Sequence, residues 1–152
     1  MSRIPDLGDK YKNLPKVIAE YDSALDDIEE KIKIKGKKLE GANMENPTWQ
    51  SYYDQKRIEL KTLTDFFDME VARVRGKLFK SYKESSGYAL NERETNQYIN
   101  NEEAYLTMYG MYLEVKEMLD KYKAVVDAYT TRGYALNNIT KIRVASLEDA
   151  LL

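Results

Sequence analysis

A seven-residue repeat of apolar side chains runs through the last third of the sequence. Its members are separated alternately by three and four positions, and the pattern lasts for more than four heptads. A repeat of this kind keeps one apolar seam turned toward a partner helix, as in coiled coils. We therefore predict a helix over about residues 100–145 with a seam formed by Tyr105, Met108, Tyr112, Val115, Leu119, Tyr122, Val126, Tyr129, Gly133 and Leu136.

The repeat changes register after Leu136. The seven-residue frame continues at Thr140 and Arg143, whereas the nearby apolar residues are Ile139 and Ile142. A change of register makes a different face of the helix apolar and offers a second surface to partners. We predict self-association through Leu136, Ile139 and Ile142. The alternative interpretation is ordinary fraying of the helix toward the C-terminus.

Two further segments have helical periodicity. They cover about residues 15–40 and 48–83, and between them Gly36, Gly41 and Pro47 predict a break, with Thr48 as a cap for the second helix. Residues 1–14 show no period and are expected to form a flexible arm. The prediction is an all-α fold in which residues 15–152 form a single helical domain. Its architecture would be a long-helix bundle or coiled-coil hairpin with a long C-terminal helix.

The composition narrows the possible chemistry. Histidine and cysteine are absent, which removes imidazole bases, thiolate nucleophiles and the usual zinc ligands. We predict that the protein is not an enzyme and uses neither a cofactor nor a metal. There is no apolar run of membrane-spanning length and no signal-peptide pattern at the N-terminus, so we expect a soluble protein of the cytoplasm.

The end of the second predicted helix is locally basic although the whole chain has a net charge of −2. The segment VARVRGKLFKSYK, residues 71–83, contains five cations and no acid, and aromatic residues accompany them. Cations bind phosphates and aromatic rings stack on bases, a combination typical of single-stranded nucleic-acid binding. Equally, cations at a helix C-terminus are favoured by the dipole, and the rings can belong to the core. The candidate residues are Arg73, Arg75, Lys77, Lys80, Lys83 and Tyr82, with Tyr88 close by.

A second group of cations lies in residues 31–38. These lysines follow an acidic stretch, an order that favours the helix dipole and allows ion pairs such as Asp27 with Lys31. We favour a solvated helix that is stabilised by its own charges over a binding patch. The group is nevertheless the competing candidate for a DNA site.

Residues 38–143 resemble the UvsY family of phage recombination mediators. The segment VVDAYTTRGYALNNITKIR, residues 125–143, is similar to the family's closing segment, in which an Arg-Gly-aromatic step precedes apolar residues at helical spacing. Earlier landmarks occur in the family's order: Leu39, Pro47, Trp49, Tyr53 and the basic-x-basic-Leu step Arg75-Gly76-Lys77-Leu78 before tyrosine and Ser-Gly.

The resemblance implies a bacteriophage protein of DNA recombination, repair and replication, located in the cytoplasm of the bacterial host. It would form a ring-shaped homo-oligomer of about six to eight subunits. It would bind single-stranded DNA and promote loading of a RecA-type recombinase onto DNA covered by single-strand-binding protein. The implied DNA contacts are Arg75 and Lys77, and the implied oligomer interface contains Arg132, Gly133, Tyr134, Leu136, Ile139 and Ile142. The alternative is a structural or adaptor coiled-coil protein, for phage assembly or as a scaffold, without DNA binding.

Overall fold

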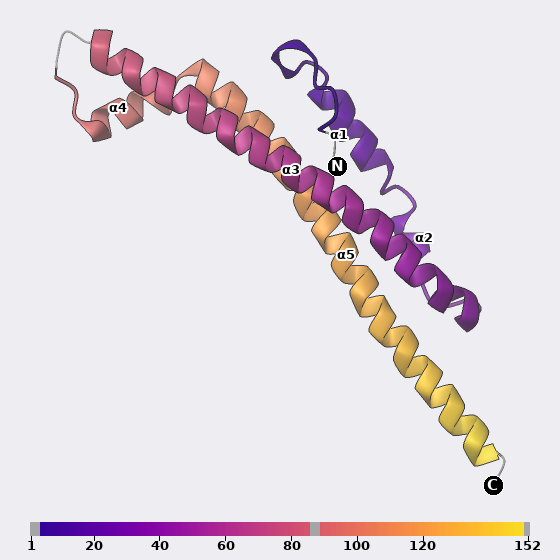
Figure 1. Cartoon of the computed structure of the whole chain (residues 1–152). Helices are drawn as coiled ribbons and strands as arrows, with labels where there is room; N and C mark the ends of the chain where they lie inside the picture. The colour runs from indigo at the N-terminus through magenta and orange to yellow at the C-terminus, as the bar shows by residue number, and fades with distance from the viewer. Residues whose placement is uncertain (1–3, 86–88, 151–152) are drawn as a thin grey trace. The chain divides into compact units, whose positions relative to one another are not determined.

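Helices account for 84% of the structure, a computed structural model that describes residues 4–85 and 89–150 without the side chains of residues 148–150. The described part contains no strand, and its long helices pack together, which confirms the predicted all-α fold. None of the described helices is long and apolar enough to cross a membrane. The elements are η1 (Asp9–Tyr11), α1 (Leu14–Ser23), α2 (Ile28–Ile32), α3 (Leu39–Ser85), α4 (Glu92–Ile99) and α5 (Glu103–Ala150) (Figure 1).

The predicted helix over residues 15–40 is wrong, because the chain forms two short helices, α1 and α2, instead. A turn separates them, and the chain is extended at Lys33, which has a ψ of 135°. Gly36 adopts a φ of 84°, which glycine accepts without the steric cost of a side chain. The Nζ of Lys37 donates to the carbonyl oxygens of Glu30 (2.7 Å) and Lys31 (3.2 Å). These bonds satisfy backbone acceptors that the end of α2 leaves without partners.

Helix α3 begins at Leu39, nine residues before the predicted start at residue 48, and runs through Pro47. Pro47 has no N–H, so the carbonyl of Asn43 receives no hydrogen bond from that position. Contacts with α5 hold this part of the helix, since the Nδ2 of Asn46 donates to the Tyr129 carbonyl oxygen at 3.2 Å. Thr48 is therefore an interior residue and not a cap. At the other end the predicted stop at Ser86 and Gly87, together with Tyr88, lies outside the described residues.

The chain divides into two compact units, one of residues 1–18 and 59–119 and the other of residues 19–58 and 120–152. We call them the first and the second unit. Both α3 and α5 contribute to each of them. A single domain over residues 15–152 stays a prediction.

The described part of the predicted arm, residues 4–14, is packed in the first unit. Leu7 and Leu14 are buried, and the Tyr11 ring lies edge-on to Phe66 and Phe67 at 5.7 and 5.3 Å between centroids. The Tyr11 hydroxyl also donates to Glu70 at 2.8 Å. This segment thus differs from the flexible arm predicted, because three apolar side chains at spacings of four and three anchor it. The core of the unit also includes Leu60, Leu63, Phe67, Ile99, Val115 and Leu119.

The predicted apolar seam of α5 is confirmed. Its buried members are Val115, Leu119, Tyr122, Tyr129 and Leu136, and the others are half-buried. In the second unit the ring of Tyr129 stacks on Tyr53 with centroids 5.6 Å apart and planes 19° apart. The Tyr129 hydroxyl has no hydrogen-bond partner in the part of the chain described, and burial raises the pKa of Tyr129 to about 12.

Arg132 is buried in the second unit and joins three of its segments. Its Nε donates to the carbonyl oxygen of Ile32, the last residue of α2, at 3.1 Å. Its Nη1 donates to the carbonyl oxygen of Ala42 at 3.3 Å and to Oδ1 of Asn46 at 3.0 Å. Arg132 and the equally buried Leu136 are therefore interior residues, and the prediction that they form an oligomer interface is wrong. The cause is the start of α3 at Leu39, which covers this part of α5.

Replacing Arg132 by methionine should lower the free energy of unfolding by about 3 kcal/mol, because buried acceptors lose their donor. Urea denaturation followed by circular dichroism measures this change. The matched control is Arg143→Met, which removes an exposed arginine from the same helix and should change stability by less than about 0.5 kcal/mol. Equal losses in the two variants would contradict the structural role of Arg132.

Candidate nucleic-acid interface

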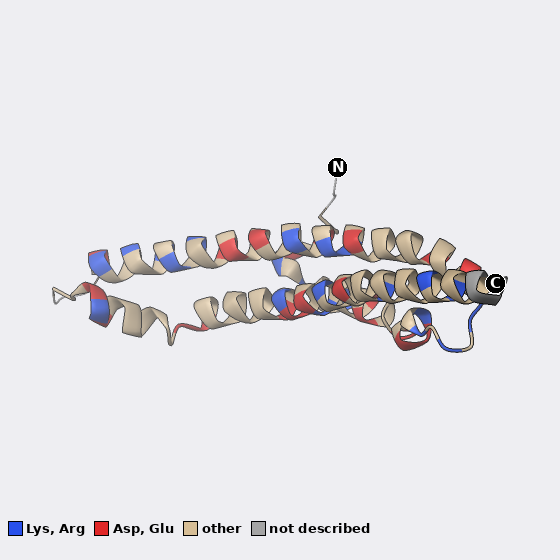
Figure 2. Cartoon of the chain, turned by 90° about the horizontal axis from the view of Figure 1, so that it is seen from below, with Lys and Arg blue, Asp and Glu red and all other residues tan. Residues whose placement is uncertain are grey.

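The last turns of α3, residues 71–83, are helical and contain no acidic residue. The helix continues here because Val74 and Leu78 recur at helical spacing and are partly buried. Lys and Arg recur along this end of α3, before the grey segment (Figure 2). The predicted cations are therefore presented by a regular helix, and their spacing decides which of them share a face.

Arg73, Lys77 and Lys80 are exposed and lie on one face of α3. They occur at i, i+4 and i+7, positions that stack along one side of a helix. We call these three residues the basic face. Gly76 lies on the same side, and a Cβ built there meets no atom within 4 Å. An anionic ligand can thus approach the helix between the three cations.

Acidic neighbours neutralise the basic face only in part. Nη1 of Arg73 lies 3.3 Å from Oε1 of Glu70, and Nζ of Lys80 lies 3.9 Å from Oε1 of Glu84. Exposed pairs of this kind contribute little energy and give way to other partners. Lys77 forms no ion pair with any described residue. The three cations are therefore accessible to phosphate groups.

Arg75 does not belong to the basic face. About 100° of rotation per residue places it roughly opposite both Arg73 and Lys77. Its Nη1 donates to Oδ1 of Asn100 at 3.1 Å and its Nη2 to Oδ1 of Asn96 at 3.2 Å. The guanidinium carbon also lies 5.0 Å from the centroid of the Tyr105 ring. Arg75 thus links α3 to α4 and α5, and the structure does not bring it together with the exposed cations.

Tyr82 and Lys83 also make contacts within the first unit. The Tyr82 hydroxyl donates to Glu102, and this bond, with burial, raises the pKa of Tyr82 above its usual value. Its ring stacks on Tyr98 at 5.6 Å, with planes 22° apart. The Nζ of Lys83 donates to the Leu90 carbonyl oxygen and lies 5.6 Å from the Phe79 ring. Tyr82 therefore offers little free ring surface to a base.

Sequence reasoning missed Tyr98 as a candidate. It lies in α4 (Glu92–Ile99) with 53% of its surface exposed. The signal was present in the segment that we left as a loop or a short helix. Asn91 and Glu94 form a capping box, in which the Asn91 side chain accepts from the Glu94 N–H and the Glu94 side chain from the Asn91 N–H. Such a box marks the start of a helix and would have placed Tyr98 on it.

The competing lysines of residues 31–38 lie in the second unit and are largely engaged by their own chain. The Nζ of Lys31 lies 3.0 Å from Oδ2 of Asp27 and 3.9 Å from the centroid of the Trp49 ring. Lys33 pairs with Glu30 at 3.6 Å, and Lys37 binds backbone carbonyls. Lys35 and Lys38 are exposed. This region therefore presents a weaker cationic surface than the end of α3.

Of the predicted oligomer interface, Tyr134 and Ile142 are exposed, by 69% and 66%, and Ile139 is half-buried. Gly133 faces inward, since a Cβ there would lie 3.1 Å from Nδ2 of Asn46. The structure adds two exposed apolar residues of α5 that sequence reasoning missed, Val144 and Leu147. The apolar surface available to a partner thus lies nearer the C-terminus than predicted.

The described residues contain no group of three or more acidic side chains that could hold a metal ion. Comparison with known proteins found no matching family model, no matching curated protein and no matching solved structure. The candidate site therefore has to be judged on its geometry and on the sequence resemblance.

Arg75→Ala should lower the free energy of unfolding by about 1–2 kcal/mol, because two hydrogen bonds and a cation–π contact are lost. Hydrogen exchange should be faster in α4, which this arginine ties to α3. Lys77→Ala, two positions away, is the matched control and should stay within about 0.5 kcal/mol of the original protein. Loss of stability in the lysine variant alone would reverse the two assignments.

Proposed function

We propose that the protein binds single-stranded DNA through the basic face of α3 and acts as a recombination mediator. In this role it promotes loading of a RecA-type recombinase onto DNA covered by single-strand-binding protein, in the cytoplasm of a phage-infected bacterium. The observation that carries the DNA-binding part is the set of three exposed cations on one side of an acid-free helical stretch. The resemblance of residues 38–143 to the UvsY family supports the recombination part.

Electrostatic attraction to phosphates is the binding mode that this surface favours. The three cations rise along α3 by about 6 Å and then by about 4.5 Å, so they face successive points of an extended chain. Three phosphate contacts give a weak, salt-sensitive site. Several copies of the site in one assembly would bind a long strand far more tightly, because each further contact becomes intramolecular. A multi-subunit mediator would use such weak sites well.

The same argument gives self-association a purpose. We propose a ring-shaped homo-oligomer of about six to eight subunits, as the family resemblance implies. Exposed apolar residues near the end of α5 support an interface there, since burying each one contributes about 1.5–3 kcal/mol. Those with at least two thirds of their surface exposed are Tyr134, Ile142 and Leu147.

The double variant Lys77→Ala with Lys80→Ala should weaken binding to a labelled single-stranded oligonucleotide regardless of its sequence. The slope of log affinity against log salt should shrink by roughly 1.4, about 0.7 for each lost contact. Fluorescence anisotropy at several salt concentrations measures both quantities. Stability should barely change, because both lysines are exposed.

The matched control replaces Lys35 and Lys38 by alanine and removes the same charge from exposed lysines in the second unit. We expect its salt slope to remain close to that of the original protein. If the control loses the slope and the α3 variant keeps it, the DNA site belongs on residues 31–38.

Self-association should weaken when Ile142 and Leu147 are both replaced by aspartate. The reason is that charged side chains would be buried at the proposed interface. Sedimentation velocity should show smaller species with unchanged helix content. Leu113→Asp introduces a charge at an exposed leucine in the first unit and serves as the control. An unchanged assembly in the double variant would place the interface on another surface.

A second candidate function is an adaptor without DNA binding. Residues 104–113 of α5 carry no charge, and Leu106, Tyr109 and Leu113 are exposed on them. Exposed apolar patches favour protein partners. The oligonucleotide titration separates the two functions, because an adaptor would show no salt-dependent binding to single-stranded DNA.

A further inference from the structure

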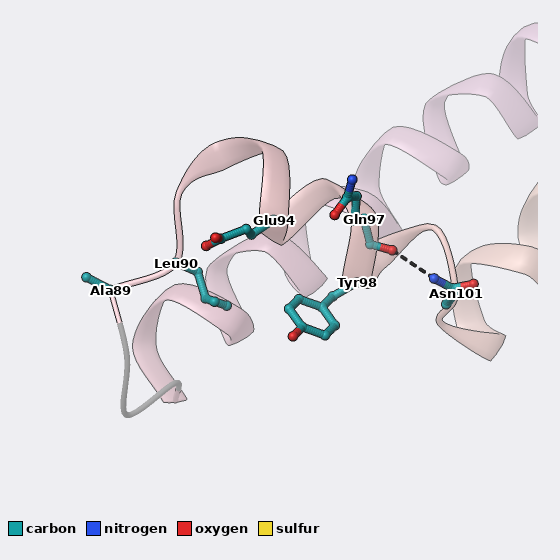
Figure 3. A pocket seen from close by; sticks show the side chains of 6 residues that line it. All are labelled: Ala89, Leu90, Glu94, Gln97, Tyr98 and Asn101. Atoms are coloured by element: carbon teal, nitrogen blue, oxygen red, sulfur yellow. Dashed lines mark hydrogen bonds between the residues drawn. The ribbon is translucent and has the colours of Figure 1, made fainter.

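A pocket of about 580 Å³ opens in the first unit beside α4 (Figure 3). Glu94, Gln97 and Tyr98 line it from α4 itself, while the remaining lining residues lie just before and just after that helix. Its volume lies within the range of pockets that bind small organic groups, about 300–1,000 Å³. The complete lining is Ala89, Leu90, Glu94, Gln97, Tyr98 and Asn101.

The aromatic ring of Tyr98 is held in place and remains accessible. One side of it stacks on Tyr82, whose hydroxyl is in turn bound to Glu102. Tyr98 is nevertheless 53% exposed and lines the pocket, with Leu90 as an apolar neighbour. A flat ring supported from behind is a platform on which a second flat group can stack, because aromatic groups prefer offset stacking.

The polar groups of the pocket are mainly hydrogen-bond acceptors. The Nδ2 of Asn101 donates to the Gln97 carbonyl oxygen at 3.0 Å, which leaves its Oδ1 open to a donor. Oε2 of Glu94 accepts from the Asn91 N–H at 3.1 Å, which leaves Oε1. The Gln97 amide forms no hydrogen bond with any described residue. The pocket therefore combines an aromatic surface with acceptors that suit a donor-bearing ring.

The geometry points to a nucleobase site: one base of single-stranded DNA stacks on Tyr98, and its exocyclic amino group donates to Glu94 or Asn101. This inference rests on the proposed function and specifies which part of the DNA the protein reads. Lys83 connects the pocket to the basic end of α3, since its Nζ binds the carbonyl oxygen of Leu90 in the pocket wall. Phosphates would lie on the basic face and the base beside α4.

The acceptors make the site selective. Cytosine, adenine and guanine carry an exocyclic amino group that can donate to a carboxylate or an amide oxygen, whereas thymine carries none. Oligo(dC) should therefore bind about tenfold more tightly than oligo(dT) of equal length. Glu94→Gln should reduce this preference, because glutamine keeps an oxygen for the capping box but brings an amide donor to the pocket.

The direct test uses an oligo(dC) with one 2-aminopurine, whose fluorescence is quenched when it stacks on an aromatic ring. Tyr98→Ala should lower affinity about tenfold and abolish the quenching, while the salt slope stays unchanged. Tyr98→Phe should restore both, because the ring is retained. Tyr109→Ala, which removes a partly exposed tyrosine of α5 outside the pocket, should bind like the original protein.

Two outcomes would overturn the inference, and they differ in what else they remove. Salt-dependent binding with full quenching and affinity in Tyr98→Ala would exclude the pocket and leave the proposed function standing. Absence of salt-dependent DNA binding in the original protein would remove the proposed function and the base site together. Equal affinity for oligo(dC) and oligo(dT) would overturn the selectivity.

Discussion

The second unit depends on one buried guanidinium. Arg132 contacts the end of α2, the first turns of α3 and the Asn46 side chain, and each contact is a hydrogen bond to an oxygen. Its charge is compensated by carbonyl dipoles at the end of α2, where the helix dipole is negative. Moving any of these segments would leave a buried charge without partners, which is costly. The arginine therefore fixes the register between α3 and α5 in this unit.

Sequence reasoning succeeded for α5 because its pattern reports burial directly. A seam repeated over four heptads has few structural explanations, and Val115, Tyr122 and Tyr129 are indeed buried. It failed for residues 15–40 because the interruption at residues 24–27 contains neither glycine nor proline. That break is stabilised by contacts from residues distant in sequence, such as the bond from Tyr122 to the Tyr21 carbonyl oxygen at 2.8 Å. Local patterns carry no record of such contacts.

The candidate site shows the same division between composition and position. The basic character of residues 71–83 could be predicted, since it needs only a count of charges. The separation of Arg75 from Lys77 could not, because it depends on Asn96 and Asn100, which belong to the segment around α4. The family resemblance grouped the two residues because they are close in sequence. A helix places residues two positions apart on nearly opposite sides, so a basic-x-basic step divides its cations between two tasks.

Pro47 has a consequence for how α3 opens. Because residue 47 cannot donate to the carbonyl of Asn43, the hydrogen-bond ladder is interrupted between the first two turns and the rest of the helix. Unwinding that starts at Leu39 meets a natural stopping point there, and the turns from residue 39 to 46 form a cooperative unit of their own. That unit carries Ala42 and Asn46, the acceptors of Arg132. Local unfolding of two turns would therefore release the arginine while the remainder of the helix stays intact.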